Sequence, residues 1–185
     1  MNDRPWLVII DPQVIFADAS SAWAAPRFGE IVEPITQLAE AFGDRTFVTR
    51  WVPTDQRRGS WTNYFTHWTF ADRPATDAIF DLVPAARTWS AHPTIDLPTF
   101  GKWGEALAAC TGEAPYLMLT GVATDCCVIS TALAAADAGA HLTVLSDACA
   151  GSSDENHAAA LHVMNLFAPQ IRLATTEEVL AEFRR

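Results

Sequence analysis

Two adjacent cysteines, Cys126 and Cys127, are the residues of this sequence with the clearest potential for chemistry. They follow an apolar run at 116–119, and the apolar residues after them recur three and four positions apart: Ile129, Ala132, Leu133 and Ala136. That spacing predicts a helix that begins near the cysteines. A thiol at a helix N-terminus lies close to unpaired backbone N–H groups and to the positive end of the helix dipole, which favour the nucleophilic thiolate. The pair therefore offers a candidate nucleophile, and the alternative is two buried spacer residues, since free cysteines are often buried.

Neighbouring residues on a helix point about 100° apart, so one of the two cysteines is expected to be a spacer. A nucleophile also needs a base and a group that stabilises an oxyanion. Asp11, which follows an apolar run, is a candidate base, or else it caps the turn before Pro12. Lys102 is a candidate cation beside these groups, or else an ordinary surface lysine. The residues alone leave these alternatives open.

Short apolar runs alternate with amphipathic segments along the chain. The expected strands are 6–11, 45–51, 114–122, 141–148 and 171–176, and the expected helices, besides the one after the cysteines, are 29–42, 152–167 and 176–185. Strands that are apolar on both faces and separated by helices predict a parallel sheet covered on both sides, with right-handed crossovers. We therefore expect one domain over residues 1–185, with an α/β doubly wound (Rossmann-like), mostly parallel sheet of about six strands. The proline-rich and aromatic segment 52–100 is expected to be a long, partly helical excursion with one short strand.

Ligands of an open parallel sheet bind beyond the C-terminal ends of its strands. Asp11 ends the first expected strand, and Arg50 and Trp51 end the second. The segment 121–127 ends the third, and Asp147 ends the fourth. The rule therefore selects these residues as candidates for a site.

Composition narrows the class of protein. Half of the 185 residues are hydrophobic and the formal net charge is −10, so we expect no nucleic-acid partner and no anionic membrane partner. No apolar run reaches the ~18 residues that a spanning helix needs. The opening segment 1–13 is typical of a strand and not of a signal peptide, which predicts a cytoplasmic protein. The expected partner is a small-molecule substrate. The four cysteines lack metal-binding spacing, and Cys110 and Cys149 are expected to be structural.

Four segments, distributed over residues 9–161, carry a recognisable pattern: IIDPQVIF (9–16), TFGKWGEAL (99–107), GVATDCCVISTALAAADAG (121–139) and VLSDACAGSSDENHAAAL (144–161). They resemble the isochorismatase-like cysteine hydrolase superfamily, which includes nicotinamidases, N-carbamoylsarcosine amidohydrolases and isochorismatases. The third segment is the most specific of the four. The family places its cysteine immediately before a valine in this turn, which matches Cys127 and makes Cys126 the variable neighbour.

The resemblance implies a catalytic triad of Asp11, Lys102 and Cys127. It also implies a cis peptide between Val122 and Ala123, and an oxyanion hole formed by the backbone N–H groups of Ala123 and Cys127. The expected activity is that of a metal-independent cysteine amidohydrolase, which uses no cofactor and cleaves a small amide or carbamoyl compound through a thioester. Homodimers or homotetramers are usual in the family and are expected here.

The subfamilies differ in ways that narrow this expectation. Nicotinamidases of the family bind a metal through an Asp-x-His after the second strand, whereas this chain reads TRWVPTDQ at 49–56, so no metal is expected. Isochorismatases cleave a vinyl ether by acid chemistry and commonly lack the cysteine, so its presence favours amide hydrolysis. A vinyl-ether hydrolase that uses Asp11 as its acid, or a catalytically silent binding protein on the same fold, are the alternatives.

The substrate pocket is expected to be lined by Phe16, Arg50, Trp51 and Trp103. Arg50 would bind a substrate carboxylate in a bidentate fashion, or else it forms a salt bridge within the protein. The aromatic residues of the segment 50–70 are expected partly in the core or a subunit interface and partly against a flat or apolar substrate.

Overall fold

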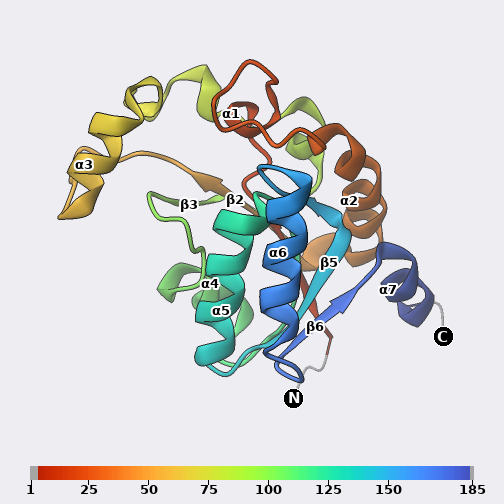
Figure 1. Ribbon diagram of the computed structural model, residues 1–185. Coiled ribbons are helices and arrows are strands. Elements are labelled where there is room, and N and C mark those ends of the chain that lie inside the picture. The colour runs from red at the N-terminus through yellow and green to blue at the C-terminus, as the bar shows by residue number, and fades with distance from the viewer. Residues whose placement is uncertain (1–3, 184–185) are drawn as a thin grey trace.

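The strand order places the first and the fourth strand side by side at the centre of the sheet. The computed structural model describes residues 4–183, in which six strands form one sheet in the order β3-β2-β1-β4-β5-β6 (Figure 1). The strands are β1 (Trp6–Ile10), β2 (Thr46–Trp51), β3 (Ile95–Leu97), β4 (Tyr116–Val122), β5 (His141–Ala150) and β6 (Ile171–Ala174), and all neighbours pair in parallel. The chain winds outward from β1 to β3 and then returns to the other side of β1, which creates a topological switch point between β1 and β4. The predicted fold class is confirmed.

Helices cover both faces of the sheet, as its doubly apolar strands require (Figure 1). On one face lie α2 (Phe28–Phe42) and α7 (Thr176–Phe183), and on the other lie α4 (Glu105–Thr111), α5 (Ile129–Asp137) and α6 (Asp154–Asn165). Successive β1 residues point to opposite faces. Leu7 and Ile9 belong to the core under α2, while Val8 and Ile10 belong to the core under α5 and α6. None of the helices within residues 4–183 is long and apolar enough to cross a membrane.

The segment 52–100 is the long, partly helical excursion that the sequence predicts. It contains α3 (Ser60–His67), the 3-10 turns Thr69–Ala71, Ala78–Phe80 and Pro84–Thr88, and the short edge strand β3. Figure 1 shows α3 projecting beyond the sheet on the β2 side. A further short helix, α1 (Val14–Ala17), directly follows the β1 exit. The aromatic residues of these elements therefore lie beside the C-terminal ends of β1 and β2.

The fourth expected strand ends later than predicted, and this moves Asp147 away from the site. The register of β4 against β5 shifts between Leu119 and Gly121, and β5 continues to Ala150. The Asp147 carboxylate accepts hydrogen bonds from the backbone N–H and the hydroxyl of Thr176, at 2.8 and 3.0 Å. Asp147 thus caps α7, and the expectation that it contributes to the site is wrong. The last two residues of the helix predicted at 176–185 lie outside the described part of the chain.

Gly121 makes the close approach of β1 and β4 possible. It pairs with Ile10 and has a φ of +104°, a conformation that residues with a side chain rarely adopt. A Cβ atom at this position would lie 2.1 Å from the carbonyl oxygen of Ile10. Backbone contact at the switch point therefore requires glycine here.

Candidate active site

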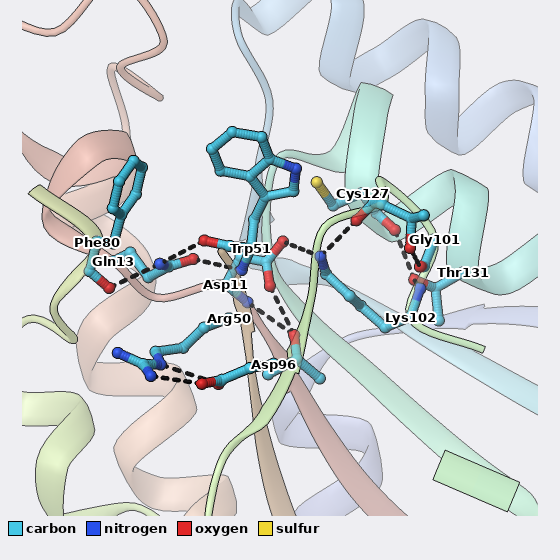
Figure 2. A network of polar contacts seen from close by, with 12 residues as sticks. Asp11, Gln13, Arg50, Trp51, Phe80, Asp96, Gly101, Lys102, Cys127 and Thr131 are labelled. Carbon is cyan, nitrogen blue, oxygen red and sulfur yellow. Dashed lines mark hydrogen bonds and ion pairs between the residues drawn. The ribbon is translucent and has the colours of Figure 1, made fainter. Parts of the chain in front are cut away.

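Asp11, Lys102 and Cys127 meet at the switch point, although they come from three distant parts of the chain (Figure 2). Asp11 directly follows β1, Cys127 lies in the turn after β4, and Lys102 lies in the loop between β3 and α4. The Lys102 Nζ atom is 3.2 Å from Asp11 Oδ2, and both side chains are 0% exposed. Cys127 is 3% exposed, and Figure 2 shows its sulfur pointing toward the Trp51 indole. The geometry therefore brings an acid, an amine and a thiol to one place.

Two features hold the Asp11 carboxylate in position. Asp11 has a φ of +49° and is the only non-glycine residue among residues 4–183 with a positive φ. Its backbone N–H donates to Thr49 Oγ1 at 3.2 Å, and the Thr49 hydroxyl donates to Asp11 Oδ1 at 2.7 Å. Such backbone conformations persist where the surroundings enforce them, and they cluster at functional sites. The strained turn aims the carboxylate toward Lys102.

Lys102 is fully buried and is not the surface lysine that the sequence alone also allowed. Its ammonium group donates to the Thr99 carbonyl at 2.7 Å, besides its ion pair with Asp11. Its backbone N–H donates to Thr131 Oγ1 at 2.9 Å, and the Thr131 hydroxyl donates to the Cys127 carbonyl at 2.7 Å. Thr131 on α5 thus connects the lysine loop directly to the turn that carries Cys127.

The turn that carries the two cysteines is a π-helical turn, Thr124–Val128, and α5 begins only at Ile129. The expected single helix is therefore divided, and π-helical turns are frequent at functional sites. The peptide between Val122 and Ala123 is cis. The Ala123 carbonyl accepts from the N–H groups of Cys126 and Val128, at 3.0 and 3.1 Å, which closes the turn. An oxyanion hole at Ala123 and Cys127 stays a prediction.

The electrostatics of the resting site keep a proton on Cys127. The hydrogen bond with Cys126, burial and the nearby Asp11 carboxylate together raise the pKa of Cys127 well above its ordinary value. The same hydrogen bond, with help from Lys102, lowers the pKa of Cys126 despite burial and the carboxylates of Asp125 and Asp11. Burial also raises the pKa of Asp11, although Lys102, Thr49 and Cys127 act against it. Position at a helix start therefore does not make Cys127 a resting thiolate, because burial and a neighbouring carboxylate oppose the helix dipole.

We expect alkylation to label the two cysteines in a defined order. With iodoacetamide at pH 6–7, Cys126 should react before Cys127, because its pKa is lowered and its side chain is more exposed. Peptide mass spectrometry at short reaction times measures the order, and Cys126→Ala is the matched variant that leaves only Cys127 in the turn. Faster labelling of Cys127 in the wild-type protein would contradict this electrostatic account.

A cavity of about 260 Å³ lies in front of Cys127. Its lining residues are Phe16, Ala22, Trp23, Ala24, Trp51, Tyr64, Trp68, Phe100, Ala123, Asp125, Cys126, Cys127 and Ser152. A larger hollow of about 480 Å³ lies at the opposite, N-terminal ends of β4 and β5 and contains none of the three clustered residues. The cavity at Cys127 is therefore the candidate substrate site.

Phe16 and Trp51 line the cavity as expected, whereas Arg50 and Trp103 do not. Arg50 and Trp51 are neighbours on β2, so their side chains point to opposite faces. Arg50 instead forms a bidentate pair with Asp96 of β3, at 2.9 and 2.5 Å, which is the salt-bridge alternative. Trp103 packs against the core under α4 and α5. The prediction that these two residues line the pocket is wrong.

Sequence reasoning missed several lining residues. Trp23 lies in the loop before α2, where no periodicity marks it, and Phe100 was noted only as part of the lysine segment. Asp125 and Ser152 come from separate turns, and the Asp125 carboxylate accepts from the Ser152 backbone and hydroxyl at 2.8 and 2.6 Å. The position of Asp125 one residue before the cysteine pair was the only available signal.

Gln13 holds the backbone beside the cavity in place through three hydrogen bonds. Its amide nitrogen donates to the carbonyl oxygens of Trp51 and Phe80, at 2.9 and 2.7 Å, and its amide oxygen accepts from the Trp51 N–H at 2.7 Å (Figure 2). Gln13, Trp51 and Phe80 are all buried, so these backbone groups have no access to water. A single side chain thereby joins β2 to the excursion.

Replacing Gln13 with leucine is expected to lower the free energy of unfolding by about 2–3 kcal/mol, because it leaves buried backbone groups unsatisfied. Urea denaturation measures the change. Gln37→Leu is the control, since Gln37 is an exposed glutamine whose amide contacts only Glu33. Equal stability of the two variants would contradict the anchoring role of Gln13.

His157 and the two remaining cysteines lie in different surroundings. His157 on α6 hydrogen-bonds the Thr124 hydroxyl at 2.8 Å, which ties this helix to the cysteine turn. Cys149 is buried, as a structural cysteine should be, but Cys110 is exposed on α4. Within residues 4–183, no group of three or more His, Cys, Asp or Glu residues has a geometry that could hold a metal ion.

The doubly wound α/β fold thus brings a carboxylate, an ammonium and a thiol together at its switch point. The family model for the isochorismatase domain matches residues 5–177, and the chain belongs to the isochorismatase-like hydrolase superfamily. No curated protein matches the chain in sequence.

Solved structures agree with this fold. A cysteine hydrolase from Pseudomonas syringae pv. phaseolicola superposes with a TM-score of 0.83 at 17% identity, over 98% of this chain and 92% of the other. An isochorismatase-like hydrolase from Alkaliphilus metalliredigens gives a TM-score of 0.77 at 17% identity, over 97% and 98% of the two chains. A nicotinamidase from Bacillus subtilis gives 0.72 at 20% identity, over 92% and 98%. At these identities the comparison concerns the fold alone.

Proposed function

We propose that this protein is a metal-independent cysteine amidohydrolase that cleaves a small amide or carbamoyl compound through a thioester. The observation that carries the proposal is the buried Asp11–Lys102 ion pair beside Cys127, with a cavity directly in front of the sulfur. A buried thiol alone would be a spacer, but a thiol with a buried carboxylate as its neighbour has a base within reach.

Proton transfer is the first step of the proposed reaction. Asp11 accepts the Cys127 proton as the thiol attacks the carbonyl carbon, and Lys102 remains charged beside both groups. The raised pKa of the Asp11 carboxyl makes it a better proton acceptor than an ordinary aspartate would be. The thiol therefore stays protonated at rest and loses its proton when a carbonyl is available.

The remaining steps return the site to its resting state. The tetrahedral oxyanion accepts hydrogen bonds from the N–H groups of Ala123 and Cys127, and one such donor can contribute about 3 kcal/mol to lowering the barrier. Collapse breaks the C–N bond, and protonated Asp11 gives its proton to the departing amine or ammonia. Asp11 then takes a proton from water as the water attacks the thioester. The C–S bond breaks, the acid leaves, and Asp11 returns the proton to the Cys127 sulfur. The sum is amide plus water to acid plus amine.

A screen of small amides, carbamoyl compounds and isochorismate tests this function, with ammonia and pyruvate followed together. We expect ammonia without pyruvate, rates unchanged by EDTA, and an acylated Cys127 peptide after acid quench. Pyruvate release that survives Cys127→Ala and fails in Asp11→Asn would instead support the vinyl-ether hydrolase. If neither ammonia nor pyruvate forms, and Cys127 does not react with any of the substrates, the result would support the catalytically silent binding protein.

A further inference from the structure

The walls of the cavity are built from aromatic rings. Phe16 and Trp23 stack at 10°, and most of the other contacts are at wide angles. Trp23 lies at their centre, with ring centroids 5.2 Å from Trp51 at 81°, 5.8 Å from Tyr64 at 41° and 5.9 Å from Trp68 at 69°. Phe100 continues the wall, 5.4 Å from Tyr64 at 71°. Rings at such angles present both faces and edges to the enclosed space, and they hold one another in place.

Any charge that the lining of the cavity can carry is negative. None of its lining residues is a lysine, an arginine or a histidine, and its ionisable members are Tyr64, Asp125 and the two cysteines, which become negative when they ionise. Lys102 does not line the cavity, and its charge is paired with Asp11. A substrate carboxylate would therefore find no cationic partner here, whereas a positive group would find a carboxylate and aromatic rings.

From this lining we infer that the amide substrate carries a compact organic cation, such as a quaternary ammonium group, which the aromatic walls and Asp125 recognise. The inference rests on the proposed function, because it assigns the non-reacting part of that substrate. Tryptophan rings attract cations most strongly among the aromatic side chains, and the attraction is largest where water is excluded. A cation of this kind has no N–H groups to satisfy, so an apolar wall suits it.

Asp125 determines the sign of the charge that this cavity accepts. Its two oxygens accept from Ser152, which orients the carboxylate but does not neutralise it. Asp125 and Cys127 line the same cavity of about 260 Å³, so the cation and the scissile carbonyl have to fit together within that small space. The aromatic walls supply the remaining surface of the compartment.

Three amides with the same three-carbon spacer test the inference: 4-(trimethylammonio)butanamide, its uncharged carbon isostere 5,5-dimethylhexanamide, and the anion glutaramate. We expect kcat/KM for the cation to exceed that for the isostere by about tenfold or more, which corresponds to ~1.4 kcal/mol of cation recognition. Glutaramate should be the poorest of the three. Equal or better turnover of the uncharged isostere would overturn the inference.

Two carboxylate variants separate local recognition from overall charge. Asp125→Asn keeps an oxygen acceptor for Ser152 but loses the charge, and it should reduce the cation-to-isostere ratio by about fivefold. Asp137→Asn makes the same unit change in net charge at the exposed far end of α5 and should leave the ratio unchanged. An equal fall in both variants would assign the effect to the net charge and overturn the role of Asp125.

Calorimetric binding of the same three amides to the Cys127→Ala protein keeps the inference distinct from the hydrolytic function. Tighter binding of the cation than of the isostere, without turnover in the wild-type protein, would retain the recognition site and reject hydrolysis. Turnover in the wild-type protein without any preference for the cation, in rate or in binding, would reject this inference alone.

Discussion

Replacing Cys127 with alanine is expected to reduce the hydrolysis of a substrate amide by about 10⁴-fold or more, because the covalent step loses its nucleophile. Replacing Cys126 with alanine should cost about tenfold at most, since Asp11 hydrogen-bonds the thiol of Cys127 and not that of Cys126. Steady-state ammonia release measures both rates. The pair of variants is closely matched, because each removes one sulfur from the same turn.

A structural explanation of the Cys127 effect can be excluded with a second variant. Cys127→Ser retains the shape of the side chain and should also be inactive, because its hydroxyl is a far weaker nucleophile at the pH of the assay. Thermal unfolding of all three variants should show that the fold persists. If Cys127→Ala hydrolysed the amide at the wild-type rate, Cys127 would be rejected as the nucleophile. If only Cys126→Ala lost most of its activity, Cys126 would be the nucleophile instead.

Replacing Lys102 with methionine is expected to lower the free energy of unfolding by about 3–5 kcal/mol at neutral pH, because it leaves the Asp11 carboxylate buried without its cation. Activity should fall as well, since the ammonium no longer stabilises the charge that develops between acid and thiol. Chemical denaturation and ammonia release measure the two effects. Arg50→Met is a suitable control, because it breaks an ion pair that is partly exposed to solvent.

The stability loss should depend on pH in a definite direction. Burial raises the pKa of folded Asp11, and Lys102 counteracts part of that rise, so its removal raises the pKa further. A folded-state pKa above the unfolded value means that the folded protein binds the proton more readily. The Lys102→Met variant should therefore lose least stability at acidic pH and progressively more as the pH rises through the folded pKa of Asp11.

A double variant separates stability from chemistry. Asp11→Asn combined with Lys102→Met removes both charges, so we expect it to recover most of the lost unfolding free energy, to within about 1–2 kcal/mol of the wild type. It should remain inactive, because the base is gone. A double variant as unstable as Lys102→Met alone would show that the lysine stabilises the fold through packing and not through its charge.

The fold could be predicted from the sequence because its signals are local. Uninterrupted apolar runs such as 6–10 are buried on both faces, and the helices between them have apolar stripes that fit those faces. The excursion 52–100 was also marked by its prolines and aromatic residues. The end of β5 was not predictable, because the register shift opposite Gly121 arises from pairing between strands and not from local preference.

The site could be predicted in part. The three clustered residues were identified because each follows a strand or belongs to a segment that resembles the superfamily. The side-chain directions of Arg50 and Trp103 depend on which face of the sheet carries the cavity, and the sequence does not specify this. The protonation of the cysteine pair was also missed, because it depends on burial and on the distance to a carboxylate that is 116 positions away from Cys127.

Gly121 has a consequence for how such a protein can evolve. The strand that leads to the acid and the strand that leads to the sulfur touch backbone to backbone there, with no room for even one extra carbon atom. Selection for catalysis and selection for a foldable chain therefore bear on the same position and cannot be relaxed independently. A lineage that abandoned the chemistry would still have to keep this glycine, whereas the aromatic walls would be free to diverge.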